Sequence, residues 1–216
     1  MTENARGRWV CVDGVEGAGK TTLTRALGPL LDAVAIKEFS KTSFGAALRE
    51  AVRSTPHFIS HSPVGQSLVF LGDFIELFDS EIAPALQKGR TVITDRGWVS
   101  KYAYQRAVLE ERLPCEEADA LVRRLLDYLP QPDLTVLLTA PLPVLQQRLV
   151  ERDGACDEHR LAFIRKADDY AEEFANSLPP DRWMMIDTNR REEEVLAAVR
   201  VWVEERDAAA SAAEAL

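Results

Sequence analysis

The stretch Gly14-Val15-Glu16-Gly17-Ala18-Gly19-Lys20-Thr21 decides the fold, because it matches the pattern G-x-x-x-x-G-K-[ST] at every fixed position. A short β-rich run at residues 9–12 precedes it, and a segment with helical periodicity at residues 21–31 follows it. Glycines let backbone N–H groups converge on phosphate oxygens, and the following helix directs its positive end at the anion. The alternative is a glycine-rich turn that only joins a strand to a helix. We therefore predict a loop that binds a nucleoside triphosphate.

The loop also predicts individual roles. Lys20 is expected to contact the β and γ phosphates of ATP, and the Thr21 hydroxyl to ligate Mg²⁺. The predicted cofactor-binding residues are Gly14, Val15, Glu16, Gly17, Ala18, Gly19, Lys20, Thr21 and Thr22. The chain has no N-K-x-D segment that would read a guanine base. The loop thus predicts a bound nucleoside triphosphate with Mg²⁺, and leaves the reaction open.

A second pair of polar residues, Asp95 and Arg96, follows the predicted strand at residues 91–94. A carboxylate at the C-terminal end of a parallel strand lies on the ligand side of the sheet, where Asp95 would hold a Mg²⁺ water. An arginine beside it would clamp a second phosphate in a bidentate manner. On position alone, a surface Asp–Arg pair explains these two residues equally well.

Outside these motifs, apolar runs alternate with helical periodicity along the chain, which favours an α/β P-loop NTPase fold. We expect a five-stranded parallel sheet flanked by helices on both faces, as one domain over residues 1–216. Strands are expected at residues 9–12, 33–36, 91–94, 134–139 and 183–186. Helices are expected at residues 21–31, 42–53, 63–88, 99–109, 114–129, 141–151, 161–176 and 191–206. Pro84 is expected to bend the third helix, residues 152–160 to form a short lid, and residues 207–216 to fray.

Composition excludes several classes of protein. The 216 residues are 46% hydrophobic and 28% charged, which is typical of a globular chain and not of a disordered one. The net charge of −9 argues against binding a nucleic-acid polymer or an anionic membrane. The three cysteines are far apart and form no C-x-x-C pair, and the N-terminus lacks the apolar core of a signal peptide. A cytoplasmic protein with small-molecule partners is expected.

Five segments together resemble the thymidylate kinases, P-loop enzymes that phosphorylate dTMP with ATP. The resemblance runs from about Arg8 to Val203. It is carried by VDGVEGAGKTT (12–22), KEFSKTSFGAALRE (37–50), LVFLGDFIEL (68–77), TDRGWVSKYAYQ (94–105) and PDLTVLLTAPLPVLQQRL (132–149). The fourth segment is similar to the family signature D-R-[YFH]-x-x-S-x-x-A-Y-Q, which singles out this family. The resemblance implies a nucleoside monophosphate kinase that acts on dTMP or a related pyrimidine deoxynucleotide, and a homodimer.

Roles carried over by this resemblance fall into three groups. The substrate-binding residues it implies are Glu16, Phe39, Phe70, Phe74, Arg96, Ser100, Tyr104, Gln105 and Tyr170. Among them, Phe70 matches the aromatic that stacks on thymine, and Arg96 the arginine that bridges both phosphates. The implied catalytic residues are Lys20, Arg96, Arg148, Arg152 and Arg160, the last three in or beside the lid. The implied metal ligands are Thr21, Asp95 and Glu16.

The chain departs from the family pattern at four places. Phe74 stands where an arginine hydrogen-bonds the base, so the pocket is expected to be more apolar and to separate pyrimidines poorly. Gly97 replaces an aromatic and is expected to open space, while Phe39 replaces a proline. The lid is short and carries Asp153, Asp157 and Glu158. Three functions remain open: a divergent dTMP kinase, a kinase of another nucleotide or nucleotide-like metabolite, and a catalytically idle nucleotide-binding regulator.

Overall fold

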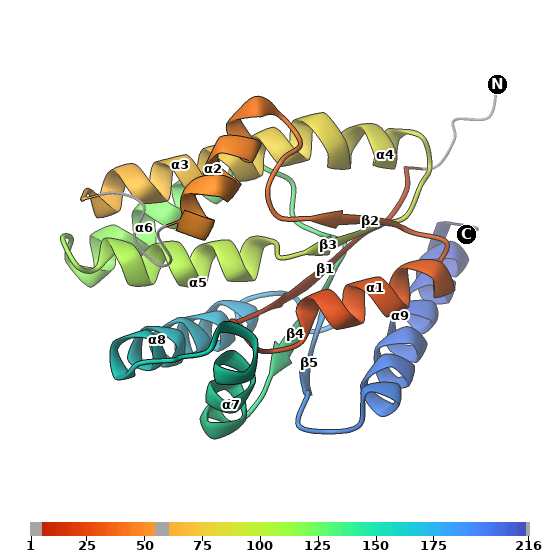
Figure 1. The fold of residues 1–216 in the computed structure, drawn as a ribbon. Helices are drawn as coiled ribbons and strands as arrows, with labels where there is room; N and C mark the ends of the chain where they lie inside the picture. Colours follow the sequence, from red (N-terminus) through yellow and green to blue (C-terminus); the bar gives the residue numbers. More distant parts are fainter. Residues whose placement is uncertain (1–5, 55–60, 215–216) are drawn as a thin grey trace.

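The computed structural model describes residues 6–54 and 61–214, and its centre is a sheet of five parallel strands. The strands are β1 (Trp9–Gly14), β2 (Val34–Lys37), β3 (Val92–Asp95), β4 (Leu134–Thr139) and β5 (Trp183–Asp187), in the order β2-β3-β1-β4-β5 (Figure 1). The central strand β1 is buried along its whole length. The order reverses around β1, so the loops that follow β1, β3 and β4 open at one edge of the sheet. The predicted α/β fold with a five-stranded parallel sheet is confirmed.

Helices cover both faces of the sheet, because β1 carries apolar side chains on each of its two faces. Trp9 and Cys11 face one hydrophobic core, whereas Val10 and Val12 face the other. The first core is closed by α3 (Pro63–Leu77), η1 (Phe78–Ile82), α4 (Ala83–Gln87), α5 (Trp98–Leu109) and α6 (Cys115–Leu126). The second is closed by α1 (Lys20–Leu30), α7 (Leu142–Asp153) and α9 (Glu192–Glu214). The long helix α8 (Glu158–Ala175) contributes to both cores, and α2 (Ser43–Ser54) follows β2 (Figure 1).

The bend expected at Pro84 takes the form of a π-helical turn. The π-helix η1 ends at Ile82, and Pro84 lies in the first turn of α4. Proline lacks an N–H and its ring collides with the carbonyl four residues earlier in an α-helix. A wider turn just before the proline avoids this collision and keeps the chain helical.

Two segment boundaries differ from the sequence expectation. The helix α9 continues to Glu214 rather than fraying after Arg206, because its alanine-rich end has the highest intrinsic helix propensity. Residues 215–216 lie outside the described residues. The expected lid is also shorter, since α7 extends to Asp153 and α8 begins at Glu158. Gly154 ends α7 in the left-handed conformation, with φ of 84°, and Asp157 caps α8 by accepting a hydrogen bond from the N–H of Arg160 (2.8 Å).

The loop after β2 is fixed to α3 by a buried polar contact. The hydroxyl of Ser40 donates to Asp73 Oδ1 over 2.7 Å, and both residues are fully buried. Arg49 of α2 donates to the carbonyl of Phe39 over 2.9 Å. These contacts set the positions of Glu38 and Phe39 at the open edge of the sheet. None of the helices among the described residues combines the length and the apolar character that a bilayer span needs.

Candidate active site

The loop from Gly14 to Gly19 is built for a bound anion. Three of its glycines have positive φ, and a Cβ atom at Gly14 would lie 2.4 Å from the carbonyl oxygen of Leu138. Only glycine permits both the backbone angle and the close approach to β4. Gly19 starts α1 without any side chain that caps the first turn. The N–H groups at this helix end therefore point toward the loop and favour a phosphate there.

Lys20 is held inside the loop. Its Nζ atom donates to the carbonyl of Val15 over 2.7 Å, and the residue is buried. Burial and the nearby guanidinium of Arg96 lower the pKa of Lys20 to about 7. A bound polyphosphate would reverse this effect, because an anion favours the charged form of lysine. The geometry thus fits the predicted role of Lys20 as a phosphate ligand.

The chemistry of the predicted metal site fits Mg²⁺. The hydroxyl of Thr21, at the start of α1, donates over 2.5 Å to Asp95 Oδ2, at the end of β3, so two oxygen ligands lie together. This pair fits Mg²⁺, which takes one or two protein oxygens together with substrate phosphates. The third predicted ligand, Glu16, instead pairs with arginines of the lid.

Arg96 lies in a strained backbone conformation at the end of β3. Its φ of 81° belongs to the left-handed region, which costs energy for a residue with a side chain. Its Nε atom pairs with Glu38 Oε2 at 2.8 Å, and its guanidinium lies 4.8 Å from the centroid of the Tyr104 ring. Burial opposes the charge, but Glu38 and its neighbours outweigh this and raise the pKa of Arg96. Arg96 is thus a permanent cation held rigidly at the open edge.

All three predicted lid arginines lie beside the phosphate loop, and Arg160 pairs with its acidic side chain. Its guanidinium pairs with Glu16 and with Asp153 (2.7 Å), and its side chain is 12% exposed. Arg152 pairs with Asp153 at 2.7 Å and lies 3.6 Å from Glu16, with 56% of its side chain exposed. Arg148 is used differently, since it donates to the carbonyls of Gly17 (3.0 Å) and Thr188 (2.7 Å). These bonds tie the loop to the end of β5.

The phenylalanines predicted to line the substrate pocket differ in how deeply they are buried. Phe39 and Phe70 are half-buried, and their ring centroids lie 5.8 Å apart. Phe74, in contrast, is 1% exposed and packs in the core beside Trp9. The ammonium of Lys101 lies 5.5–5.7 Å from the centroids of these three rings, so a cation accompanies them, and the more apolar pocket stays a prediction. Phe70 and Phe74 lie four residues apart and therefore share a face of α3. The spacing does not show which of the two packs in the core.

The expectation that Gly97 opens space is wrong. A Cβ atom at this position would lie 2.2 Å from Cys11 Sγ. The space that a side chain would need is filled by the cysteine of β1. The glycine therefore allows β1 and the start of α5 to approach closely, rather than loosening the site.

Two of the four remaining substrate-pocket residues predicted in α5 and α8, Ser100 and Tyr104, support the phosphate loop from behind, and Gln105 is buried. Tyr104 accepts a hydrogen bond from the N–H of Glu16 (2.9 Å), and burial raises its pKa to about 12. Ser100 lies with its hydroxyl 3.4 Å from the backbone of Gly14. Tyr170 is drawn away from the loop, because its hydroxyl bonds Glu110 (2.5 Å) and its ring covers Arg106.

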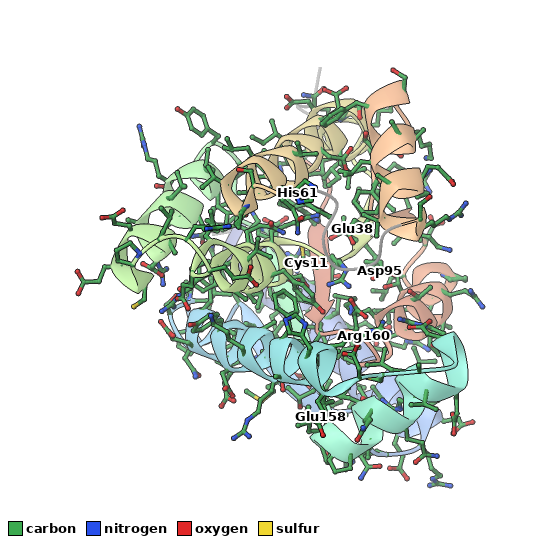
Figure 2. The ribbon with its side chains drawn as sticks, turned by 60° about the vertical axis from the view of Figure 1, so that its left-hand side comes forward. Cys11, Glu38, His61, Asp95, Glu158 and Arg160 are labelled. Carbon is green, nitrogen blue, oxygen red and sulfur yellow. The ribbon has the colours of Figure 1, made fainter. Side chains whose placement is uncertain are left out.

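A cavity of about 1280 Å³ lies at the open edge of the sheet, and its wall includes Glu16, Lys20, Thr21, Arg96 and Arg148. Glu38 after β2 and Asp95 at the end of β3, both labelled in Figure 2, also line it. Two parts of its wall escaped the sequence analysis: Glu38 after β2, and residues 188–196 after β5. Glu38 and residues 188–196 each follow a strand. Ligands bind beyond the carboxyl ends of parallel strands, so these positions could have been predicted from the expected strands.

One half-buried carboxylate, Asp168, makes stability depend on pH. Burial and the neighbouring carboxylates Asp169 and Glu172 raise the pKa of Asp168 to about 6, and its Oδ1 atom has no hydrogen-bond partner among the described residues. Because the folded pKa lies above the unfolded one, the folded state loses stability as the pH rises from about 4 through 6. Asp168→Asn should therefore stabilise the protein by about 1–3 kcal/mol at pH 8, with a gain that shrinks toward pH 4.

Thermal melts of Asp168→Asn and wild type from pH 4 to 8 measure this effect. Asp181→Asn, at an exposed position, is the matched control and should change the melting temperature little at any pH. A gain for Asp168→Asn that is the same at every pH would contradict the electrostatic origin.

Comparisons with known proteins agree with this geometry. A family model described as thymidylate kinase matches residues 12–199. A thymidylate kinase of Halorhodospira halophila is 34% identical over 223 residues, which cover 94% of this chain and 95% of that protein. A probable thymidylate kinase of Pyrobaculum aerophilum is 32% identical, with 88% of this chain and 93% of that protein covered. The solved thymidylate kinase of Candida albicans has a TM-score of 0.74 at 22% identity, over 94% of this chain and 93% of that one, and so shares the fold.

Proposed function

Because the chain belongs to the thymidylate kinase family, we propose that it transfers the γ-phosphoryl group of ATP to dTMP. The observation that carries this proposal is the meeting of Lys20, Asp95 and Arg96 at one edge of the sheet, around one cavity. A nucleotide-binding regulator would need the loop, but not a strained arginine beside it. We also propose that the protein forms a homodimer, on the basis of the family resemblance. A cytoplasmic location is proposed from the cysteine usage.

Each residue has a part in the transfer. A phosphate oxygen of the acceptor attacks the γ-phosphorus, the bond to the bridging oxygen breaks, and ADP leaves. The loop N–H groups and Lys20 bind the ATP phosphates, while Thr21 and Asp95 would hold Mg²⁺, which neutralises charge on the β and γ oxygens. Arg96, held by Glu38 at the edge of the cavity, would contact the transferred group and stabilise its charge. Arg160 approaches from the lid side.

ADP release measured with and without dTMP tests this function. We expect ADP to form only when a monophosphate acceptor is present, with one dTDP for each ADP. A screen of nucleoside monophosphates identifies the acceptor, and a different preferred nucleotide would favour a kinase of another metabolite. Tight ATP binding with no turnover on any acceptor would instead indicate a regulator.

The two lid arginines that contact Glu16 are expected to differ in importance. Arg160→Ala should lower kcat by about 10–100-fold, because a buried cation aimed at the loop acts where the dielectric is low. Arg152→Ala is the matched control, and its exposed side chain should matter less than about fivefold. Steady-state kinetics of both variants at saturating ATP decide this, and equal losses would contradict the assignment.

A further inference from the structure

Asp13 carries a fully buried carboxylate near the end of β1, just before the phosphate loop. Its Oδ1 atom accepts hydrogen bonds from the N–H groups of Gly97 (2.7 Å) and Ser100 (3.0 Å). Its Oδ2 atom has no hydrogen-bond partner among the described residues. A carboxylate this deeply buried does not touch a substrate, and it is costly unless hydrogen bonds compensate for the lost water. The role of Asp13 therefore lies in what its two backbone donors hold.

These two bonds make Asp13 the cap of helix α5. The N-cap residue of α5 is Gly97, which has no side chain that could accept a hydrogen bond from the first turn. Helices usually begin with a side-chain oxygen that accepts from the N–H of their second or third residue. Ser100 is the third residue of α5, so Asp13 supplies that oxygen from a strand 87 residues earlier. A Cβ atom at position 97 would lie 2.2 Å from Cys11 Sγ and 3.3 Å from Asp13 Oδ2, so only glycine fits between strand and helix.

The same bonds hold the turn that carries Arg96. Arg96 directly precedes Gly97, and its own N–H donates to the carbonyl of Val12 over 3.0 Å. Val12 and Asp13 thus hold two successive residues of the turn against β1. Arg96 has a left-handed φ of 81°, which a residue with a side chain keeps only where its surroundings enforce it. The guanidinium of Arg96 lines the cavity, so a constraint on this turn acts on the site.

We propose that Asp13 is the positioning residue of Arg96: its carboxylate fixes the turn after β3, so that the guanidinium meets the phosphates without rearrangement. This inference rests on the proposed function and adds a residue to it. Oδ1 holds two N–H groups through its lone pairs, so the acceptor atom carries the effect and not the negative charge. Because Gly14 follows Asp13 directly, the same residue ties the phosphate loop to the arginine that faces the acceptor.

Asp13→Ala and Asp13→Asn, each alone and combined with Arg96→Ala, test this role by steady-state kinetics with ATP and dTMP. Asp13→Ala should lower kcat about 10–100-fold, since a small misplacement of a catalytic group is this costly. Asp13→Asn keeps the Oδ1 acceptor, and its loss should stay below about fivefold. In the Arg96→Ala background, Asp13→Ala should cost less than about a further twofold, because the group that it positions is already absent. An equal loss in both backgrounds, or in Asp13→Ala and Asp13→Asn, overturns the inference.

Urea denaturation gives a second test, which does not depend on turnover. Glycine relieves the left-handed strain at position 96, so Arg96→Gly should have a higher urea midpoint than Arg96→Ala. Without the Asp13 bonds the turn is free to leave the left-handed region. The difference between the two midpoints should therefore fall by about half or more in the Asp13→Ala background. An unchanged difference would show that Asp13 does not enforce the conformation of Arg96.

Asp133→Ala is the matched control. Asp133 also accepts from a backbone N–H of β1, that of Trp9 over 2.7 Å, but at the opposite end of the strand. Its loss should leave kcat within about twofold of wild type, even where the melting temperature falls. A loss of kcat like that of Asp13→Ala would mean that Asp13 only stabilises β1, and the inference would be wrong. A wild type that phosphorylates no monophosphate overturns the proposed function instead, whereas the urea comparison still decides the role of Asp13.

Discussion

Replacing Lys20 with methionine is expected to lower kcat about 10²–10³-fold while the protein stays folded. The loop holds the Lys20 ammonium in a buried position, 2.7 Å from the carbonyl of Val15, where it is poorly solvated. Such a cation interacts strongly with the phosphate charge that develops during transfer. Methionine keeps the length of the stem and loses the charge. Because a buried, uncompensated charge is removed, the melting temperature should stay the same or rise.

Lys37→Met is the control for this experiment. Lys37 also lines the cavity, but its side chain is exposed at the end of β2. We expect its kcat to remain within about fivefold of wild type, as for other solvated charges. Wild-type turnover in Lys20→Met would mean that the loop does not bind the transferred phosphate. Equal losses in both variants would point to the overall charge of the cavity instead.

Replacing Arg96 with alanine should lower kcat and kcat/KM together, by about 10³-fold. The reason is that the Arg96 guanidinium is fixed between Glu38 and the Tyr104 ring, and needs no rearrangement to meet the transferred group. An interaction made only in the transition state is lost from both constants. A variant with a raised KM and an unchanged kcat would show instead that Arg96 only binds the acceptor.

Glycine at the same position separates catalysis from folding. The left-handed φ of 81° suits glycine and strains alanine. Arg96→Gly should therefore be as inactive as Arg96→Ala but more stable, by about 1 kcal/mol in the free energy of unfolding. Urea denaturation of the two variants measures this difference. Equal stability would mean that the backbone strain is absent in solution.

The sequence predicted the parts of the site that depend on neighbouring residues. The phosphate loop needs a contiguous run of glycines followed by Lys20 and Thr21, so its pattern is visible in the chain itself. Arg96 and Asp95 were found because they follow a strand directly. The alternation of apolar strands and amphipathic helices likewise indicated the parallel sheet, since burial on two faces leaves a continuous apolar run.

Only the tertiary structure decided how distant side chains share charge and space. Arg160 and Arg152 look alike in the sequence, yet one is buried against Glu16, 144 residues away, and the other is exposed. The sequence does not single out Lys101, whereas the structure pairs it with Glu38, 63 residues away. Helical periodicity tells which residues share a face, but what meets that face depends on the packing of the whole chain. Burial and ion pairing are set by those non-local contacts, and they determine which lid arginine pairs with Glu16 and which one bonds backbone carbonyls.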